Sequence, residues 1–211
     1  MKKLAIIGSS FFAEQIAHLA VEANYNVVGY FDDFKNKGID EDGKNIFGKI
    51  DDVKNCFVEN KFDEIFIGIG ENNLAAKAII FEKLQQQNIP FATIIHSTCI
   101  IDRTAKIGKG AILYTGCIID QHCVVEENVV LNLGCIVAHH SVIKRNSFLA
   151  PAVKMAGNCI VGEQCFLGIN TTLINYISIA NNVHTGGSTT IIESIDNAGL
   201  YVGSPAKKIK D

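Results

Sequence analysis

An aliphatic residue or methionine recurs at every sixth position through the second half of the chain. The series starts at Ile95 and runs unbroken to Ile179, fifteen positions in all. A period of six cannot stay on one face of a helix with 3.6 residues per turn, so the pattern excludes helices here. It predicts a stack of short strands that each direct one apolar side chain inward, with no long loop between these two residues.

Two further series share the same period. Positions from Cys99 to Thr171 hold small or β-branched residues, and positions from Gly110 to Asn182 are rich in glycine and asparagine. Glycine and asparagine tolerate left-handed backbone best, so the latter series predicts a tight turn in each hexad. With three hexads per coil, residues 18 apart would stack about 4.8 Å from one another. One such column contains Asn128, Asn146, Gln164 and Asn182.

Six of the seven cysteines occupy the series of small residues. These are Cys99, Cys117, Cys123, Cys135, Cys159 and Cys165. A free cysteine packs as a small hydrophobic residue, so we expect core filling rather than metal binding or redox chemistry. Reduced thiols also fit a cytoplasmic protein.

The first ninety residues have a different rhythm, in which apolar runs alternate with helical spacing. They predict strands over 3–7, 27–31 and 65–70, helices over 11–23 and 72–87, and a loop over 35–49. Alternation of this kind is typical of a small parallel, Rossmann-like α/β sheet. We therefore expect two domains, residues 1–92 and residues 93–211.

Glycines and polar residues follow the three predicted strands. Ligands of parallel sheets bind beyond the carboxyl ends of the strands, where glycines let backbone N–H groups approach a pyrophosphate and an acidic residue can accept from a ribose or base. The pattern GxGxxG is absent, because Ser10 and Ala13 stand in the places of its later glycines, so a dinucleotide cofactor is not expected. The candidate substrate-binding residues are Gly8, Ser9, Ser10, Asp32, Asp33, Gly70 and Asn72.

Composition narrows the classes of partner. The formal net charge is −3, 19% of residues are charged, and no run of like charge is present. These values give no electrostatic footprint for nucleic acid. No apolar run approaches the roughly 18 residues of a membrane span. We expect a soluble cytoplasmic protein.

A small α/β domain followed by hexapeptide repeats resembles the NeuD/PglD family of sugar acetyltransferases. This family includes N-acetyltransferases of nucleotide-linked 4-amino-4,6-dideoxy sugars and sialic acid O-acetyltransferases. The resemblance covers nearly the whole chain. The stretches that carry it are Tyr30–Phe34, Gly68–Asn72, Ile94–His96, Gly157–Cys159, Phe166–Gly168 and the tail Gly203–Lys207.

The resemblance implies a left-handed parallel β-helix in a homotrimer with active sites between subunits. It implies that the N-terminal domain binds the nucleotide of the sugar substrate and that acetyl-CoA, the acyl donor, lies along the solenoid. The cofactor-binding residues expected on this basis are Gly157, Gly168, Gly186, Gly187, Pro205 and Lys207.

The segment from Asn132 to Ile143 matches the frame in which the family places its catalytic histidine. His139 takes that place as general base, since a neutral imidazole can accept a proton near pH 7, and Asn132 is an expected substrate contact. The chain departs from the family at two positions. His140 replaces the acidic residue that follows the base, and Phe148 stands where some members have a second histidine. A backbone carbonyl or another carboxylate could orient the base instead.

The leading hypothesis is acetyl-CoA-dependent N-acetylation of a nucleotide-linked 4-amino-4,6-dideoxy sugar, with UDP favoured, for a bacterial surface glycan. Three alternatives remain open: O-acetylation of sialic acid or another sugar, a non-catalytic solenoid that binds nucleotide sugars, and a γ-carbonic-anhydrase-like metalloenzyme. His122 and His140 would stack on adjacent coils, but the next residue of that column is Asn158, and catalytic zinc usually takes three protein ligands. We therefore expect no metal.

Overall fold

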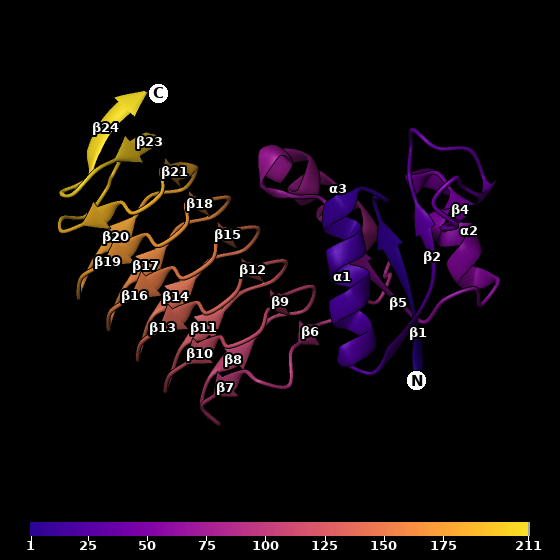
Figure 1. Ribbon diagram of the computed structural model, residues 1–211, viewed down its shortest axis with the longest axis horizontal. Helices are drawn as coiled ribbons and strands as arrows, with labels where there is room; N and C mark the ends of the chain where they lie inside the picture. The colour runs from indigo at the N-terminus through magenta and orange to yellow at the C-terminus, as the bar shows by residue number, and fades with distance from the viewer. Residues whose placement is uncertain (211) are drawn as a thin grey trace. The chain divides into compact units, whose positions relative to one another are not determined.

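The computed structural model describes residues 1–210 and divides into two compact units, Met1–Ile94 and a second unit that begins at Ile95. Figure 1 shows an α/β unit in indigo to magenta and a stack of short strands in magenta to yellow. Each unit has its own buried apolar cluster. The two rhythms of the sequence thus correspond to two kinds of architecture.

The N-terminal unit is built on a five-stranded sheet with the order β3-β4-β2-β1-β5. Strands β4, β2, β1 and β5 run parallel, and β3 pairs with β4 in the antiparallel direction. The apolar run Leu4–Ile7 is buried, which accounts for the central place of β1. The strands are β1 (Lys2–Ile7), β2 (Tyr25–Phe31), β3 (Gly38–Ile39), β4 (Asn45–Gly48) and β5 (Glu64–Ile67).

Helices α1 and α3 lie where the helical spacing predicts them. Helix α1 buries the face formed by Ala13, Ile16, Leu19 and Ala20. Asn73 caps helix α3, because its side chain accepts a hydrogen bond from the backbone N–H of Ala76 at 3.3 Å. The helices are α1 (Phe11–Glu22), η1 (Ile50–Asp52), α2 (Val53–Val58), η2 (Glu71–Asn73) and α3 (Leu74–Gln86).

The expectation of a loop over residues 35–49 is wrong in part. The segment contains the hairpin β3–β4, and β4 joins the sheet beside β2, with Ile46 opposite Tyr30. Ile46 is buried, but it belongs to a strand of only four residues. So short a stretch carries too little alternation to reveal a strand in the sequence. Helix α2 likewise lies where the apolar pattern predicts no element.

The second unit is a parallel β-helix of two- to four-residue strands arranged in three sheets, closed by β24, which pairs with β23 in the antiparallel direction. One sheet contains β6 (Ile94–Ile95), β9 (Ile112–Leu113), β12 (Val130–Leu131), β15 (Phe148–Leu149), β18 (Phe166–Leu167), β21 (Val183–Thr185), β23 (Gly199–Val202) and β24 (Lys207–Lys210). The second contains β7 (Ile100–Ile101), β10 (Ile118–Ile119), β13 (Ile136–Val137), β16 (Lys154–Met155), β19 (Thr172–Leu173) and β22 (Thr190–Ile191). The third contains β8 (Lys106–Ile107), β11 (Val124–Val125), β14 (Val142–Ile143), β17 (Ile160–Val161) and β20 (Ser178–Ile179).

The register confirms a coil of 18 residues. Ile119 pairs with Val137 and Leu131 with Leu149, both in parallel. The second residue of each strand from β9 to β20 is buried, and together with the small-residue series these side chains form one continuous apolar core. The aliphatic series of the sequence therefore lines the inside of the solenoid, and no long loop interrupts it.

The predicted left-handed turns are present. Every non-glycine residue of the glycine- and asparagine-rich series from His122 to Asn182 has a φ angle between 53° and 65°. The expected asparagine column is also seen, since Asn128 Nδ2 donates to Asn146 Oδ1 at 2.8 Å. The turn series thus forms the corners between sheets.

The seven cysteines, all among the described residues, are free thiols. Cys117, Cys123, Cys135, Cys159 and Cys165 are fully buried, and Cys99 is partly exposed. Burial raises the pKa of Cys165 to about 11. The expectation of core packing is confirmed. Across residues 1–210, no helix has the length and apolar character needed to cross a membrane.

Candidate active site

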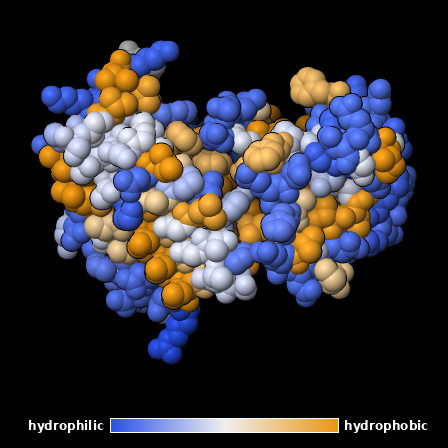
Figure 2. Space-filling view, viewed as in Figure 1, coloured by the Kyte–Doolittle hydropathy of each residue, from blue (hydrophilic) through white to orange (hydrophobic). Residues whose placement is uncertain are grey.

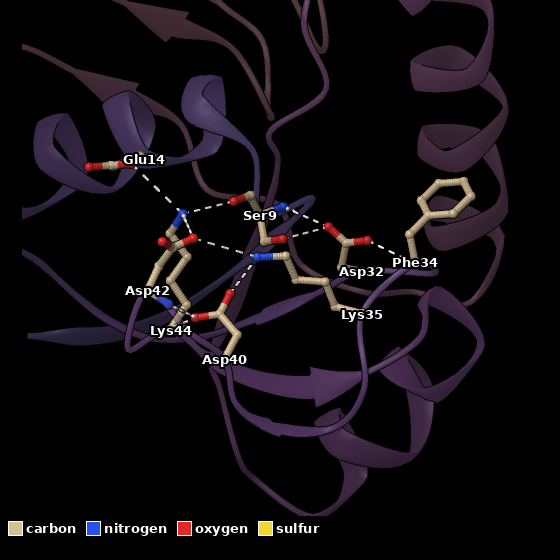
Figure 3. Close-up of polar contacts among 8 residues, drawn as sticks. All are labelled: Ser9, Glu14, Asp32, Phe34, Lys35, Asp40, Asp42 and Lys44. Atoms are coloured by element: carbon tan, nitrogen blue, oxygen red, sulfur yellow. Dashed lines mark hydrogen bonds and ion pairs between the residues drawn. The ribbon is translucent and has the colours of Figure 1, made fainter.

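The carboxyl ends of β1 and β2 meet through Asp32. Its Oδ2 accepts hydrogen bonds from the backbone N–H of Ser9 at 3.0 Å and from Ser9 Oγ at 2.6 Å, and its Oδ1 accepts from the backbone N–H of Phe34 at 2.9 Å (Figure 3). Ser9 is buried. Two predicted site residues are therefore in direct contact, and the Asp32 carboxylate fixes the loops that follow both strands.

Gly8 is required by the backbone at this point. Its φ is +86°, and a Cβ there would lie 3.1 Å from the carbonyl oxygen of Gly68 in the chain beyond β5. Its N–H donates to the carbonyl of Phe31 at 2.7 Å. A side chain would strain the close approach of the three strand ends.

The remaining predicted residues of this unit flank the same strand ends. The backbone N–H of Ile50 donates to Asp33 Oδ1 at 2.9 Å, so this carboxylate anchors the segment after β4. Ser10 is exposed and precedes the first residue of α1. Gly70 and the exposed Asn72 follow β5, which lies beside β1 in the sheet.

Two lysines near the carboxyl ends of β1 and β2 were not predicted from the sequence. Lys44 Nζ donates to the carbonyl of Ser9 at 2.9 Å and lies 3.8 Å from carboxylate oxygens of both Glu14 and Asp42 (Figure 3). Only 13% of its side chain is exposed. Lys35 Nζ donates to Asp40 Oδ2 at 2.5 Å, and that hydrogen bond raises the pKa of Lys35. Both lie in the segment taken as a polar loop, where no pattern distinguishes them.

His139 lies at the corner between β13 and β14. Its Nδ1 is 3.2 Å from Nδ1 of His140, and its backbone carbonyl accepts from the N–H of Asn158 at 2.9 Å. Gly157 is one coil further along, and a Cβ there would lie 2.4 Å from Cε1 and 2.6 Å from Nε2 of His139. The imidazole therefore occupies the space that a side chain at position 157 would need.

His122 and His140 stack on adjacent coils as predicted. Their ring centroids are 4.8 Å apart with an angle of 45° between the ring planes. Among residues 1–210, no group of three or more histidine, cysteine or acidic side chains could hold a metal ion. The sequence did not reveal which group contacts the His139 ring, and in the structure this group is the ring of His140.

Another corner of the solenoid collects four of the predicted residues. Asn132 follows β12, Gly168 follows β18, and Gly186 and Gly187 follow β21, all in the same sheet. Asn132 Oδ1 accepts from the N–H of Leu133 at 2.8 Å. A Cβ on Gly168 would lie 2.6 Å from the carbonyl of Thr185, so the coils approach closely here. Within one chain, Asn132 and His139 lie at different corners of a coil.

The last two predicted residues lie in the C-terminal tail. Pro205 and Lys207 line a cavity of about 340 Å³ together with Tyr201 and Asp196. The N–H of Ala206 between them donates to the carbonyl of Thr190 at 2.8 Å, which joins the tail to the last coil.

Phe148, the second departure from the family pattern, packs against another aromatic ring. It is buried, and its ring centroid lies 5.8 Å from that of Phe166 on the next coil. Phe166 in turn lies 6.0 Å from the ring of His184. These three rings form a ladder along one sheet.

Comparisons with known proteins cover both units. Residues 3–84 match the family model of the PglD N-terminal domain. The sequence matches no curated protein. Among solved structures, the acetyltransferase domain of PglB from Neisseria gonorrhoeae in complex with acetyl coenzyme A is 22% identical, with a TM-score of 0.89 over 99% of each chain.

Two further structures share the fold. A mutant of perosamine N-acetyltransferase from Caulobacter crescentus, in complex with CoA and GDP-perosamine, is 21% identical, with a TM-score of 0.90 over 100% of this chain and 98% of that one. WeeI from Acinetobacter baumannii is 17% identical, with a TM-score of 0.82 over 99% and 100%. The expected fold class, a Rossmann-like domain followed by a left-handed hexapeptide β-helix, is confirmed. Residues 3–84 match the PglD N-terminal domain family, and the whole chain has the fold of the Neisseria and Caulobacter acetyltransferases.

Proposed function

We propose that the protein transfers the acetyl group of acetyl-CoA to the 4-amino group of a nucleotide-linked 4-amino-4,6-dideoxy sugar. The observation that carries the proposal is the combination of a PglD-type N-terminal domain with a fold shared over its full length with sugar acetyltransferases. We take UDP as the nucleotide and the cytoplasm, where acetyl-CoA is available, as the place of reaction. The product would serve bacterial surface glycan synthesis.

The N-terminal domain, residues 1–92, would hold the nucleotide. The N–H groups at the start of α1 and the glycine at position 8 form a strand-to-helix turn of the kind that binds pyrophosphate. Lys44 holds a positive charge beside Ser9 at the same edge. Asp32 and Asp33 order the neighbouring loops and supply the polar surface for a ribose or base. Gly70 and Asn72 extend that surface beyond β5.

The solenoid, residues 93–211, would perform the chemistry. The amine nitrogen of the sugar attacks the thioester carbonyl carbon, and Nε2 of His139 accepts the proton that the nitrogen loses. The carbon–sulfur bond then breaks, CoA leaves as a thiolate, and a backbone N–H stabilises the oxyanion that forms on the way. Asn132 would contact the sugar. Acetyl-CoA would lie along the corner of the solenoid that contains Gly168, Gly186 and Gly187 and reach the tail at Pro205 and Lys207, with Gly157 beside the base.

Exposed apolar side chains support a homotrimer with active sites between subunits. Ile100 and Ile118 are exposed and one coil apart on the same sheet, and Ile174 and Ile192 are exposed and one coil apart at a corner. Figure 2 shows apolar patches among polar residues on the face of the solenoid. Repeated apolar positions on a rigid surface favour association with a second surface of the same period. Light scattering on the purified protein would measure its molar mass, and we expect the mass of three chains.

The experiment that tests the function measures CoA thiol release from acetyl-CoA with UDP-, GDP- and dTDP-linked 4-amino-4,6-dideoxy sugars and with free sialic acid. Release with the UDP sugar is expected, and it should be lost in His139→Ala but kept in His18→Ala, a histidine exposed on α1. Release with another nucleotide alone would correct the nucleotide. Release with sialic acid alone would replace N-acetylation by O-acetylation, and no release with any acceptor would favour a binding protein.

A further inference from the structure

His139 and His140 face one another through the same ring atom. Their Nδ1 atoms are 3.2 Å apart, and the ring planes are at 81°. Two imidazole nitrogens at this distance form a hydrogen bond only when one of them carries a proton and the other does not. With both rings neutral, the contact therefore requires opposite tautomers, Nδ1–H in one ring and Nε2–H in the other.

We propose that His139 Nδ1–H donates to His140 Nδ1, which makes His140 a positioning residue that keeps Nε2 of the base free to accept a proton. The proposal rests on the function proposed above and names the group that replaces the carboxylate expected after the base. The opposite arrangement would place the proton of the neutral His139 on Nε2. A base so protonated cannot accept a proton from the amine, so only the first arrangement supports catalysis.

The acceptor is held in place by its backbone and by its neighbours. His140 occupies the left-handed turn position, with φ of 59°, and its N–H donates to the carbonyl of Gln121 at 2.9 Å. The ring of His122, one coil earlier, packs against the His140 ring. The ring of His139 meanwhile lies over Gly157. Both members of the pair are therefore fixed by adjacent coils of the solenoid.

A neutral acceptor differs from a carboxylate in one chemical respect. When His139 takes the amine proton on Nε2, its Nδ1–H continues to donate to His140, and no proton moves between the two rings. His140 fixes the geometry and the tautomer without adding a negative charge to the site. Asparagine at the equivalent turn on the next coil, Asn158, shows that the corner itself does not require an imidazole.

The test compares two replacements that the left-handed turn accepts but that differ in whether they offer an acceptor. His140→Asp keeps an acceptor for His139, whereas His140→Gly removes it, and both residue types tolerate positive φ. The matched control is Tyr176→Gly, an exposed turn position with φ of 65° in the same column two coils away. We expect His140→Gly to lower kcat about 10- to 100-fold with little change in KM for acetyl-CoA, and His140→Asp to recover most of that loss. Equal activity in the two variants would overturn the proposal.

A second readout needs no substrate. The ¹⁵N chemical shifts of the histidine rings report which nitrogen is protonated, and we expect the Nδ1–H tautomer for His139 in the unmodified protein and in His140→Asp. His140→Gly should shift His139 toward the Nε2–H tautomer, while Tyr176→Gly leaves it unchanged. An Nε2–H tautomer for His139 in the unmodified protein would overturn the pairing. If no sugar is acetylated, the proposed function fails, and the ring shifts still decide whether the pair exists.

Discussion

Replacing Gly157 by alanine tests whether the free space over the imidazole matters. The new Cβ would lie 2.4 Å from Cε1 and 2.6 Å from Nε2 of His139, whereas ordinary van der Waals contact begins at 3.4 Å. The neighbouring backbone would have to deform to retain the ring in place, so we expect the ring to move by about 1 Å. The backbone itself accepts alanine, because φ at this position lies outside the left-handed region.

A displacement of about 1 Å at a catalytic group lowers the rate on the order of 100-fold, which corresponds to about 2.7 kcal/mol of transition-state free energy. We therefore expect kcat/KM for CoA release to fall by about that factor in Gly157→Ala. The free energy of unfolding should fall by only about 0.5–1.5 kcal/mol, the usual cost of a side chain forced off its rotamer.

The control is the same substitution without the ring. In a His139→Ala background the space above residue 157 is empty, so Gly157→Ala should leave the stability unchanged or raise it by about 0.4–1 kcal/mol through the stiffer unfolded chain. Urea unfolding of the four proteins in this cycle measures the difference. Full activity of Gly157→Ala, or the same loss of stability in both backgrounds, would refute the steric reasoning.

Three further predictions concern stability and thiol chemistry. Burial lowers the pKa of Lys77 to about 7, against 10.5 in the unfolded chain, so between these values the unfolded chain binds more protons. The free energy of unfolding therefore rises with pH over this range, by on the order of 5 kcal/mol in total. Urea unfolding measured from pH 7 to 10 should show a weaker dependence of this free energy on pH in Lys77→Met. Tyr176→Asn should raise the unfolding free energy by about 0.5–1 kcal/mol, because asparagine suits the left-handed turn; no change in Tm would contradict this. Ellman's reagent should label at most the partly exposed Cys99 before denaturation and all seven cysteines after it, whereas rapid labelling of Cys165 in the native protein would show that the core opens.

The solenoid was predictable almost residue by residue, because a single rule repeats along it. Each hexad presents the same three requirements, an apolar side chain, a small side chain and a left-handed turn, so even Tyr176 could be placed at a corner from its position in the series. The stacking of His122 on His140 followed from the 18-residue period in the same way. The strands of the N-terminal sheet were harder to predict. Strand β4 is short, shows little alternation of apolar and polar residues, and joins the sheet by pairing with β2.

The candidate site was only partly accessible to sequence reasoning. The contact between Ser9 and Asp32 follows from the rule that parallel strands end at one edge. The approach of Lys44 to Ser9 depends on a hairpin that the pattern did not reveal. Gly157 leaves room for the His139 ring on the adjacent coil. The sequence does not reveal this contact, because the backbone at position 157 does not itself require glycine.

From β7 to β20, strand residues pair with the ones 18 positions later, and this register has a consequence for how the solenoid can change in length. An insertion of 18 residues adds one layer of about 4.8 Å and returns every later side chain to its former orientation. An insertion of a single residue within a strand would instead exchange the inward and outward side chains of that strand. Within the solenoid, the gain or loss of one 18-residue layer therefore preserves the core register, whereas the last turn, from Val183 to Gly199, closes in 16 residues. A layer inserted between His139 and Gly157 would place another residue beside the His139 ring and move Gly157 one layer away. We therefore expect no layer to be inserted between these two residues.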